Sequence, residues 1–244
     1  MDGTPIHPWP TSRDEAYSVL QENARRVVID ANTPEPNLIA GVETDYGQSG
    51  DILYGAAVVV SFPEFHVVER ALYFHKLTFP YYPNLVFFRE GPAMIGALAK
   101  LKTRPDLLMI SGHGIAHPQG CGAAGHLGVM FNIPAIGCAR RLLVGQFHEP
   151  ENAKGSAEGI ALGGREVGVA YRSKDGVKPI FISPAHLCDL AFARRIAVQC
   201  LRDYRLPEPL RIAHLEVNQY RRRSDEAGGQ KNHFAHTRSE EHHE

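Results

Sequence analysis

Two segments of the chain place acidic side chains where a folded core would otherwise be apolar. In LIAGVETDY, residues 38–46, alternation along a strand puts Glu43 and Asp45 on one face. An edge strand with both acids solvated is the alternative. In FREGP, Glu90 opens a helical pattern, where the helix dipole would stabilise it by about 0.3–1 kcal/mol without any catalytic role. Grouped carboxylates can bind hard metal ions or transfer protons.

A third segment, LLMISGHGIAHP at residues 107–118, changes abruptly from apolar to small, polar and imidazole side chains. The pattern predicts a buried strand that ends at Ser111. Two glycines follow, and they would let the backbone approach a ligand closely. The same loop carries His113 and His117, which is more than packing requires. We therefore interpret this strand end as part of a functional site.

Two other motifs are less specific. GCGAAG at residues 120–125 satisfies the G-x-G-x-x-G pattern, but it does not directly follow its strand, so tight packing explains these glycines better than dinucleotide binding does. In FPYYPN, residues 79–84, prolines stiffen a loop that carries Tyr81 and Tyr82. Such rings could stack on nucleobases, a contact worth about 1–3 kcal/mol per base. Inward packing of both rings is the alternative.

The elements that must position these residues follow from the hydrophobic pattern. Thr11 and Ser12 with Glu15 form a capping-box signal for a first helix. Three β-rich segments with short links then predict an antiparallel meander. Strand and helix patterns alternate afterwards, with Pro92 expected in the first turn of one helix and Pro209 near the start of the last. The predicted fold class is α/β, a mixed sheet with helices on both faces.

The totals describe an ordinary globular protein of 244 residues, 43% of them hydrophobic, with a formal net charge of -1. This charge limits any nucleic-acid contact to a local patch. No apolar run approaches the roughly 18 residues of a membrane span, so we expect a cytoplasmic monomer without a membrane partner. The four cysteines lack metal-binding spacing and are expected to be reduced and buried. One domain is expected over residues 1–220, and a disordered polar tail over residues 221–244.

Taken in order, many segments of the chain resemble the endonuclease V family, which cleaves nucleic acid near deaminated adenine. They are IAGV, FPYYP, FREGP, KLKTRPDLL, GHGIAHP, HLGV, IPAIGCA, GVKPIFISPAH and YRLPEPLRIAH. Together they span roughly residues 16–217, nearly all of the chain that is expected to be ordered. The resemblance implies a ribonuclease H-like fold, in agreement with the mixed sheet predicted above.

The resemblance also implies how a lesion is recognised. The family's wedge tyrosine, which inserts between bases, corresponds to Tyr81. The deaminated base turns out into a pocket walled by backbone at Gly112 and Gly114, with His113 beside them as a further substrate-binding candidate. Turning a base out of a duplex costs a few kcal/mol, and hypoxanthine lowers that cost because it pairs poorly.

The metal site that the resemblance implies, for Mg2+ with Mn2+ as a substitute, departs from the family pattern at two positions. Glu90 matches the glutamate of FREGP, and His214 matches the position on the last helix. Glu43 stands where the family has an aspartate, which shifts the carboxylate by about 1.5 Å, one carbon–carbon bond. Ser111 replaces a second aspartate and removes a negative charge. Asp45 is the candidate ligand expected to restore part of that charge.

These observations lead to one principal prediction and two rivals. The principal prediction is a magnesium-dependent endonuclease that recognises inosine in DNA or RNA and cuts 3′ to the lesion, with activity weakened by the altered acids. In it Glu90 and Glu43 are catalytic, and His117 and Arg140 contact or polarise the reacting phosphate. The first rival is an inactive family member that binds modified DNA or RNA without cutting. The second is a protein that does not bind nucleic acid.

Overall fold

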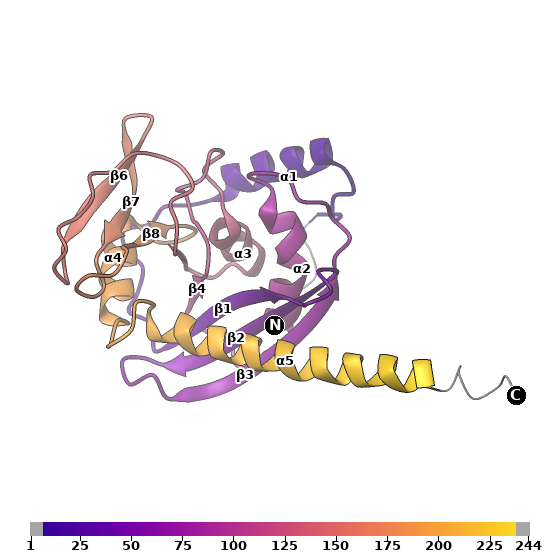
Figure 1. Cartoon of the computed structure of the whole chain (residues 1–244). Coiled ribbons are helices and arrows are strands. Elements are labelled where there is room, and N and C mark those ends of the chain that lie inside the picture. Colours follow the sequence, from indigo (N-terminus) through magenta and orange to yellow (C-terminus); the bar gives the residue numbers. More distant parts are fainter. Residues whose placement is uncertain (1–6, 238–244) are drawn as a thin grey trace, which may run out of the picture.

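One continuous sheet forms the centre of the molecule (Figure 1). The computed structural model describes residues 7–237. Its sheet has eight strands in the order β3-β2-β1-β4-β5-β8-β7-β6. In chain order the strands are β1 (Leu38–Tyr46), β2 (Ile52–Ser61), β3 (Val67–Lys76), β4 (Leu107–Ile110), β5 (Ala135–Ala139), β6 (Ala157–Leu162), β7 (Arg165–Tyr171) and β8 (Ile180–Pro184). The first three form the predicted antiparallel meander, which is confirmed.

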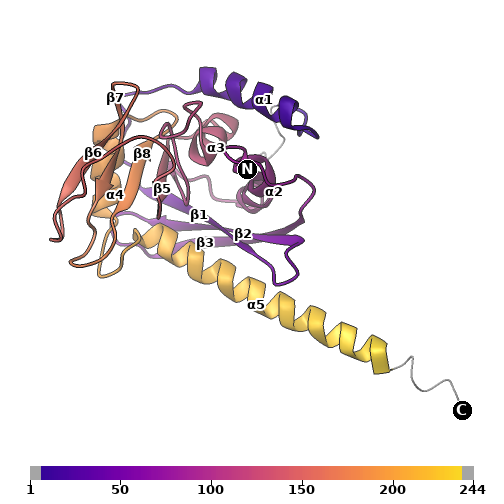
Figure 2. The same cartoon turned by 45° about the horizontal axis from the view of Figure 1, so that its top comes forward.

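Helices cover both faces of the sheet, as Figures 1 and 2 show. They are α1 (Arg13–Arg26), α2 (Val86–Ala99), α3 (Ala123–Phe131), α4 (Leu190–Gln199) and α5 (Glu208–Thr237). The first three share one hydrophobic core with one face of the sheet, and α4 and α5 share a second core with the opposite face. The α/β fold class with helices on both faces is therefore confirmed.

Three parallel strands at the middle of the sheet bring distant parts of the sequence together. β1 pairs in parallel with β4, and β4 pairs in parallel with β5. Val42 lies opposite Ile110, so the next residues along, Glu43 and Ser111, leave the pairing side by side. Arg140 directly follows β5. Ligands of open α/β sheets bind at the carboxyl ends of such strands, which marks this edge as the place for a site.

The alternation of β1 decides which helix each of its side chains faces. Val42 belongs to the core on the α2 side, whereas Ile39 belongs to the core on the α5 side. A Cβ atom at Gly41 would lie only 2.0 Å from the Pro209 carbonyl oxygen, so α5 packs directly on the strand backbone there. Glu43 therefore faces α5, and Thr44 faces α2.

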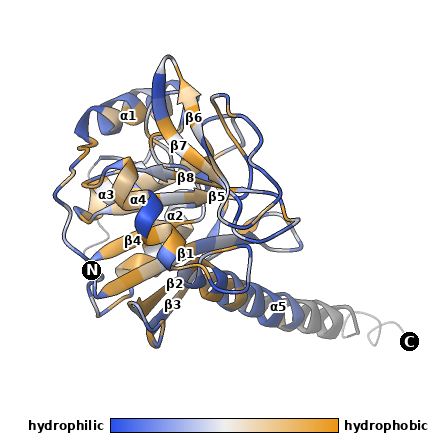
Figure 3. Cartoon of the chain, turned by 90° about the vertical axis from the view of Figure 1, so that its left-hand side faces the viewer, coloured by the Kyte–Doolittle hydropathy of each residue, from blue (hydrophilic) through white to orange (hydrophobic). Residues whose placement is uncertain are grey.

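Hydrophobic residues concentrate on the strands and on the helix faces that cover them, while the coloured part of α5 is largely hydrophilic on its side away from the sheet (Figure 3). All four cysteines are buried and free, as expected. Between residues 7 and 237, no helix is both long and apolar enough to cross a membrane.

Two of the predicted helix starts are confirmed, and the predicted position of Pro92 in a first turn is wrong. Ser12 and Glu15 form the predicted capping box of α1, and Pro209 is the second residue of α5. Pro92, however, lies inside α2, because that helix begins at Val86 instead of near Glu90. A proline has no N–H to donate to the carbonyl four residues earlier. The indole of Trp9 donates to that Phe88 carbonyl instead, at 3.1 Å.

Helix α5 also extends beyond the predicted end of the domain at residue 220. Arg221 donates to Asp45 at 2.6 Å and to Asp225 at 3.2 Å, which fastens this part of the helix to β1. Asp225 accepts in turn from the backbone of Gln48. Helix α5 therefore continues past residue 220, and these contacts fasten it to β1 as far as Asp225; the domain boundary and the disordered tail stay predictions. The rest of the predicted tail, residues 238–244, lies outside the described residues.

Candidate functional site

A partly buried ion pair lies where the parallel strands end. Arg140 Nη2 donates to Glu43 Oε2 at 2.9 Å and to His214 Nδ1 at 3.2 Å. His214 Nδ1 itself lies 3.6 Å from the same Glu43 oxygen. A guanidinium can only donate, so the lone pair of His214 Nδ1 is the acceptor. We call Glu43, Arg140 and His214 the Glu43 cluster; in it the Glu43 side chain is 7% exposed and that of Arg140 is 38% exposed.

Glu90 approaches from the other side of β1. Its Oε1 accepts from the Tyr46 hydroxyl at 2.9 Å, and its Oε2 accepts from the Thr44 hydroxyl at 3.5 Å. Burial raises the pKa of Glu90, and the negative charge of Glu43 raises it further, against the opposing effect of the Tyr46 hydrogen bond. Glu90 is the fifth residue of α2, beyond its first turn, so the proposed capping role does not describe it.

Asp45 lies on the α5 side of β1, as strand periodicity predicted for it and Glu43. Its carboxylate is bound by Arg221 at 2.6 Å. Glu43 and Asp45 are therefore each paired with an arginine, and neither acid is an exposed edge residue of the sheet, because β1 has neighbours on both sides. The role of Asp45 as a compensating metal ligand stays a prediction.

The donor groups proposed for a metal ion do not fit one in this arrangement. Across the described residues, no group of three or more His, Cys, Asp and Glu side chains is placed to hold an ion. Glu43 and His214 both accept from Arg140, which brings a positive charge to the place of a cation. Ser111 offers only a neutral hydroxyl, a poor ligand for a hard divalent ion.

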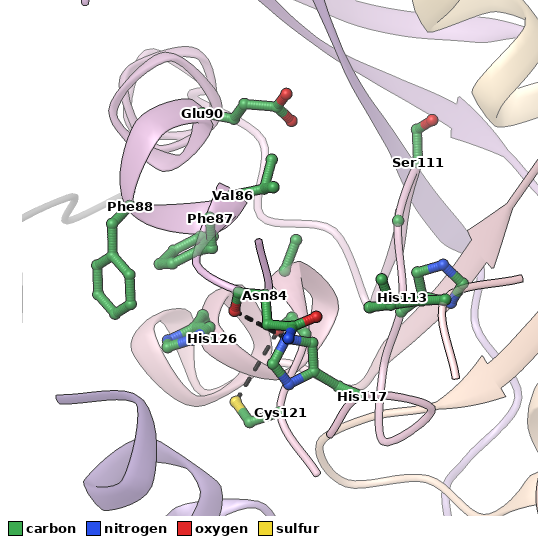
Figure 4. A pocket seen from close by; sticks show the side chains of 14 residues that line it. Asn84, Val86, Phe87, Phe88, Glu90, Ser111, His113, His117, Cys121 and His126 are labelled. Atoms are coloured by element: carbon green, nitrogen blue, oxygen red, sulfur yellow. Dashed lines mark hydrogen bonds between the residues drawn. The ribbon is translucent and has the colours of Figure 1, made fainter. Parts of the chain in front are cut away.

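A pocket of about 200 Å³ opens beside these groups, between the first turns of α2 and the loop after β4 (Figure 4). It is lined by Asn84, Val86, Phe87, Phe88, Glu90, Ser111, Gly112, His113, His117, Cys121, Gly122, Ala123, His126 and Leu143. Two of the four predicted substrate-binding residues, Gly112 and His113, are among them. Gly114 is not among the lining residues; a Cβ atom there would lie 2.0 Å from the Pro184 carbonyl oxygen, so this glycine permits packing against β8.

His117 connects the two loops that border the pocket. Its Nε2 donates to the Asn84 carbonyl at 3.0 Å (Figure 4). Its Nδ1 accepts from the backbone N–H of Gln119 at 3.3 Å. Both ring nitrogens are thus occupied, which fixes the neutral tautomer with the proton on Nε2. Asn84 has a φ of 64°, a conformation that asparagine tolerates better than most residues do.

The histidines of the pocket are neutral at pH 7. Burial lowers the pKa of His113 to about 4 and that of His126 to about 3, and it lowers the pKa of His117 as well. His113 Nδ1 has no hydrogen-bond partner within the described part of the chain. No role was predicted for His126, although it lies in the HLGV segment. Its ring stacks on Phe87 at 4.2 Å, and its Nδ1 accepts from Asn23 at 2.9 Å.

The tyrosines at residues 79–84 have opposite orientations. Tyr81 is 64% exposed, whereas Tyr82 packs edge-on against Phe79 with 5.7 Å between ring centroids. Only one ring is therefore free to stack on a base, and it belongs to the residue singled out as the wedge.

The first turn of α2 lies against the pocket without a side-chain cap. Leu85 stands at the N-cap position and makes no capping hydrogen bond through its side chain. Val86 and Phe87, the first two residues of the helix, line the pocket. Backbone N–H groups at a helix N-terminus have no partner within the helix, and the helix dipole favours an acceptor beside them. The pocket wall therefore suits a carbonyl oxygen.

Comparisons with known proteins agree on one family. The Endonuclease V family model matches residues 21–215. An Endonuclease V of Roseiflexus sp. (strain RS-1) is 42% identical over 214 residues, which cover 87% of this chain and 95% of that protein. The crystal structure of the Streptomyces avermitilis Endonuclease V has a TM-score of 0.83 at 35% identity, covering 89% of this chain and 96% of that one.

A more distant structure was solved with nucleic acid. It is a Ciona intestinalis Endonuclease V in complex with a 23mer DNA that contains an inosine followed by a ribo-adenosine. The TM-score is 0.72 at 24% identity, and the match covers 86% of this chain and 97% of that one. At 24% identity, this likeness shows that the two proteins share a fold.

Proposed function

Because this chain belongs to the endonuclease V family, we propose that it recognises deaminated adenine in DNA or RNA and cleaves a phosphodiester bond 3′ to the lesion. The observation that carries the proposal is the exposed ring of Tyr81 on the loop whose Asn84 lines the pocket. Such a ring can fill the gap in a base stack while the displaced base enters the pocket. We further propose that the protein acts in DNA repair as a single-domain cytoplasmic monomer.

The chemistry of the pocket favours hypoxanthine over adenine. Its volume of about 200 Å³ suits one base, since sites for drug-sized ligands measure about 300–1,000 Å³. The uncapped N–H groups at Val86 and Phe87 can donate to the carbonyl that deamination creates. The amino group of adenine is itself a donor, so it would face these N–H groups without forming a hydrogen bond. The neutral histidines add no positive charge that would attract a phosphate into the pocket instead.

The proposed roles of the chain's own groups follow from their contacts. His117 holds the carbonyl of Asn84 and so fixes the loop that carries Tyr81 relative to the pocket. Arg140 is 38% exposed and presents positive charge where a phosphate would pass. Glu43 and Glu90 are the proposed acidic groups of the reaction, and Mg2+, or Mn2+ in its place, is the proposed cofactor. The donor groups do not fit that ion while Arg140 is bound to Glu43, so no step of the reaction is assigned to it.

A second candidate function is lesion binding without cleavage. The specific observation in its favour is the neutral hydroxyl of Ser111 beside a Glu43 carboxylate that Arg140 already neutralises. A two-metal nuclease needs opposing ligands to hold ions about 3.5–4 Å apart. The Tyr81 ring and the first turn of α2 that lines the pocket do not depend on those ligands, so recognition would persist in an inactive protein.

One experiment separates the two candidates. Matched labelled oligonucleotides, with inosine or adenosine at one position, are incubated with the protein in Mg2+ and then in Mn2+, beside a Glu43→Asp, Ser111→Asp double variant. Cleavage of the inosine strand by the unmodified protein supports the nuclease. Selective binding with cleavage only in the double variant supports the binder. A folded protein that neither cleaves nor prefers inosine contradicts both.

A further inference from the structure

The Glu43 cluster already contains a cation. We propose that the guanidinium of Arg140 takes the place of a divalent metal ion between Glu43 and His214, so that divalent ions bind this centre only in competition with Arg140. One nitrogen, Nη2, contacts both acceptors, at 2.9 Å and 3.2 Å. This arrangement concerns the chain's own residues and does not depend on how a lesion is recognised.

The separation of the two acceptors supports a shared cation position. Glu43 Oε2 and His214 Nδ1 lie 3.6 Å apart. Two ligands of one magnesium ion, each at about 2.0–2.1 Å, lie no more than about 4.2 Å apart. The same two atoms could thus contact a small ion, and Nη2 lies beside that position, within hydrogen-bond distance of both atoms. An ion there would be repelled by the positive charge of the guanidinium, so the two compete for the acceptors.

The local charge also matches a guanidinium better than a divalent ion. Glu43 is nearly buried, and a buried carboxylate without a partner is strongly destabilising. Arg140 brings one positive charge for this one negative charge. Ser111 supplies none, so a divalent ion in the same place would be left with excess positive charge. Asp45, the other acid on this face of β1, is likewise neutralised by Arg221.

The position of Arg140 is set by the backbone. The residue directly follows β5, and its carbonyl accepts from Arg205 Nη2 at 2.8 Å. Arg205 also donates to the carbonyls of Lys178 and Pro179, which fixes it in turn. Only the side chain of Arg140 would have to move to admit an ion, and its partial exposure gives it somewhere to go.

The test is a titration with Mn2+ alone, in the absence of nucleic acid, with free Mn2+ measured by electron paramagnetic resonance. Arg140→Gln removes the charge, and Arg141→Gln, at the exposed neighbouring residue, is the matched control. We expect Arg140→Gln to bind Mn2+ about tenfold or more tightly than the unmodified protein, because a nearby positive charge no longer repels the ion. Arg141→Gln should bind as the unmodified protein does. Adding Glu43→Gln to Arg140→Gln should abolish the gain.

Equal Mn2+ affinity of the unmodified protein and Arg140→Gln would overturn the proposal, and so would a gain that survives the loss of the Glu43 carboxylate. If Arg140→Gln does not fold, the unmodified protein decides. Micromolar Mn2+ binding that Glu43→Gln removes contradicts the proposal; a melting temperature that neither Mn2+ nor a chelator changes supports it. Neither result bears on lesion binding, which is measured separately.

Discussion

Tyr81 and Tyr82 are adjacent in the sequence but differ in what substitution should do. The exposed ring of Tyr81 is available to bases, whereas the ring of Tyr82 completes an aromatic cluster with Phe79. We predict that Tyr81→Ala weakens binding to an inosine-containing duplex by roughly 5- to 150-fold, equivalent to about 1–3 kcal/mol of lost stacking. Tyr81→Phe should bind almost normally. Fluorescence anisotropy measures both, and an unchanged affinity of Tyr81→Ala would show that the ring is not a wedge.

For individual residues, the sequence predicted which face of a strand a side chain occupies better than it predicted which side chain it would contact. The strand pattern placed Glu43 and Asp45 on one face, and the structure agrees. It did not predict that Arg140 binds Glu43, because the partners are separated by 97 positions and meet only when β1 and β5 enter the same sheet. His126 was missed for the same reason, since its partner Asn23 is 103 positions away.

Two loops that border the pocket depend on one side chain. The hydrogen bond from His117 to the Asn84 carbonyl joins the loop after β4 to the loop before α2. We predict that His117→Ala destabilises the fold by about 1–3 kcal/mol, because a half-buried carbonyl loses its donor. Binding to inosine-containing nucleic acid should weaken as Asn84 moves. Urea unfolding and anisotropy measure the two effects, and His117→Gln, which can still donate, should recover part of each.

The salt dependence of binding distinguishes this positioning role from a phosphate contact. If His117 only positions the loop, His117→Ala leaves the slope of log affinity against log salt unchanged. If the imidazole contacts a phosphate, the magnitude of this slope falls by roughly 0.9 for duplex DNA, the change expected for one lost phosphate contact. The two occupied ring nitrogens favour the first outcome.

Elements with a strong hydrophobic pattern were predicted, and those defined by packing were not. Helix α2 starts at Val86, earlier than its sequence pattern suggested, because Phe87 and Phe88 bury their rings against neighbouring elements. Strand β6 was not predicted, since Ile160 is its single fully buried residue and the strand lies at the sheet edge. The start of α2 and the strand β6 both depend on contacts with residues far away in the sequence, which a local sequence pattern does not include.

Several histidines are buried in the fold, where burial favours the neutral ring, and this makes the stability of the protein depend on pH. Burial lowers the pKa of His126 to about 3 and that of His113 to about 4, both below the unfolded value of about 6.5. As the pH falls, the unfolded chain therefore takes up protons first. The stability contributed by the neutral rings is complete above about pH 6.5 and is lost between there and the folded pKa values. Glu90, whose pKa is raised, acts in the opposite direction over the acidic part of this range.

We predict that the free energy of unfolding falls between pH 7 and pH 5, with His126 alone accounting for on the order of 2 kcal/mol. Urea unfolding at several pH values measures this loss. His126→Gln cannot take up a proton, so its stability should be lower at pH 7 but should decline less steeply. His148→Gln, at an exposed position, should keep the slope of the unmodified protein. An equal slope in His126→Gln would mean that the buried imidazole is not what links this fold to pH.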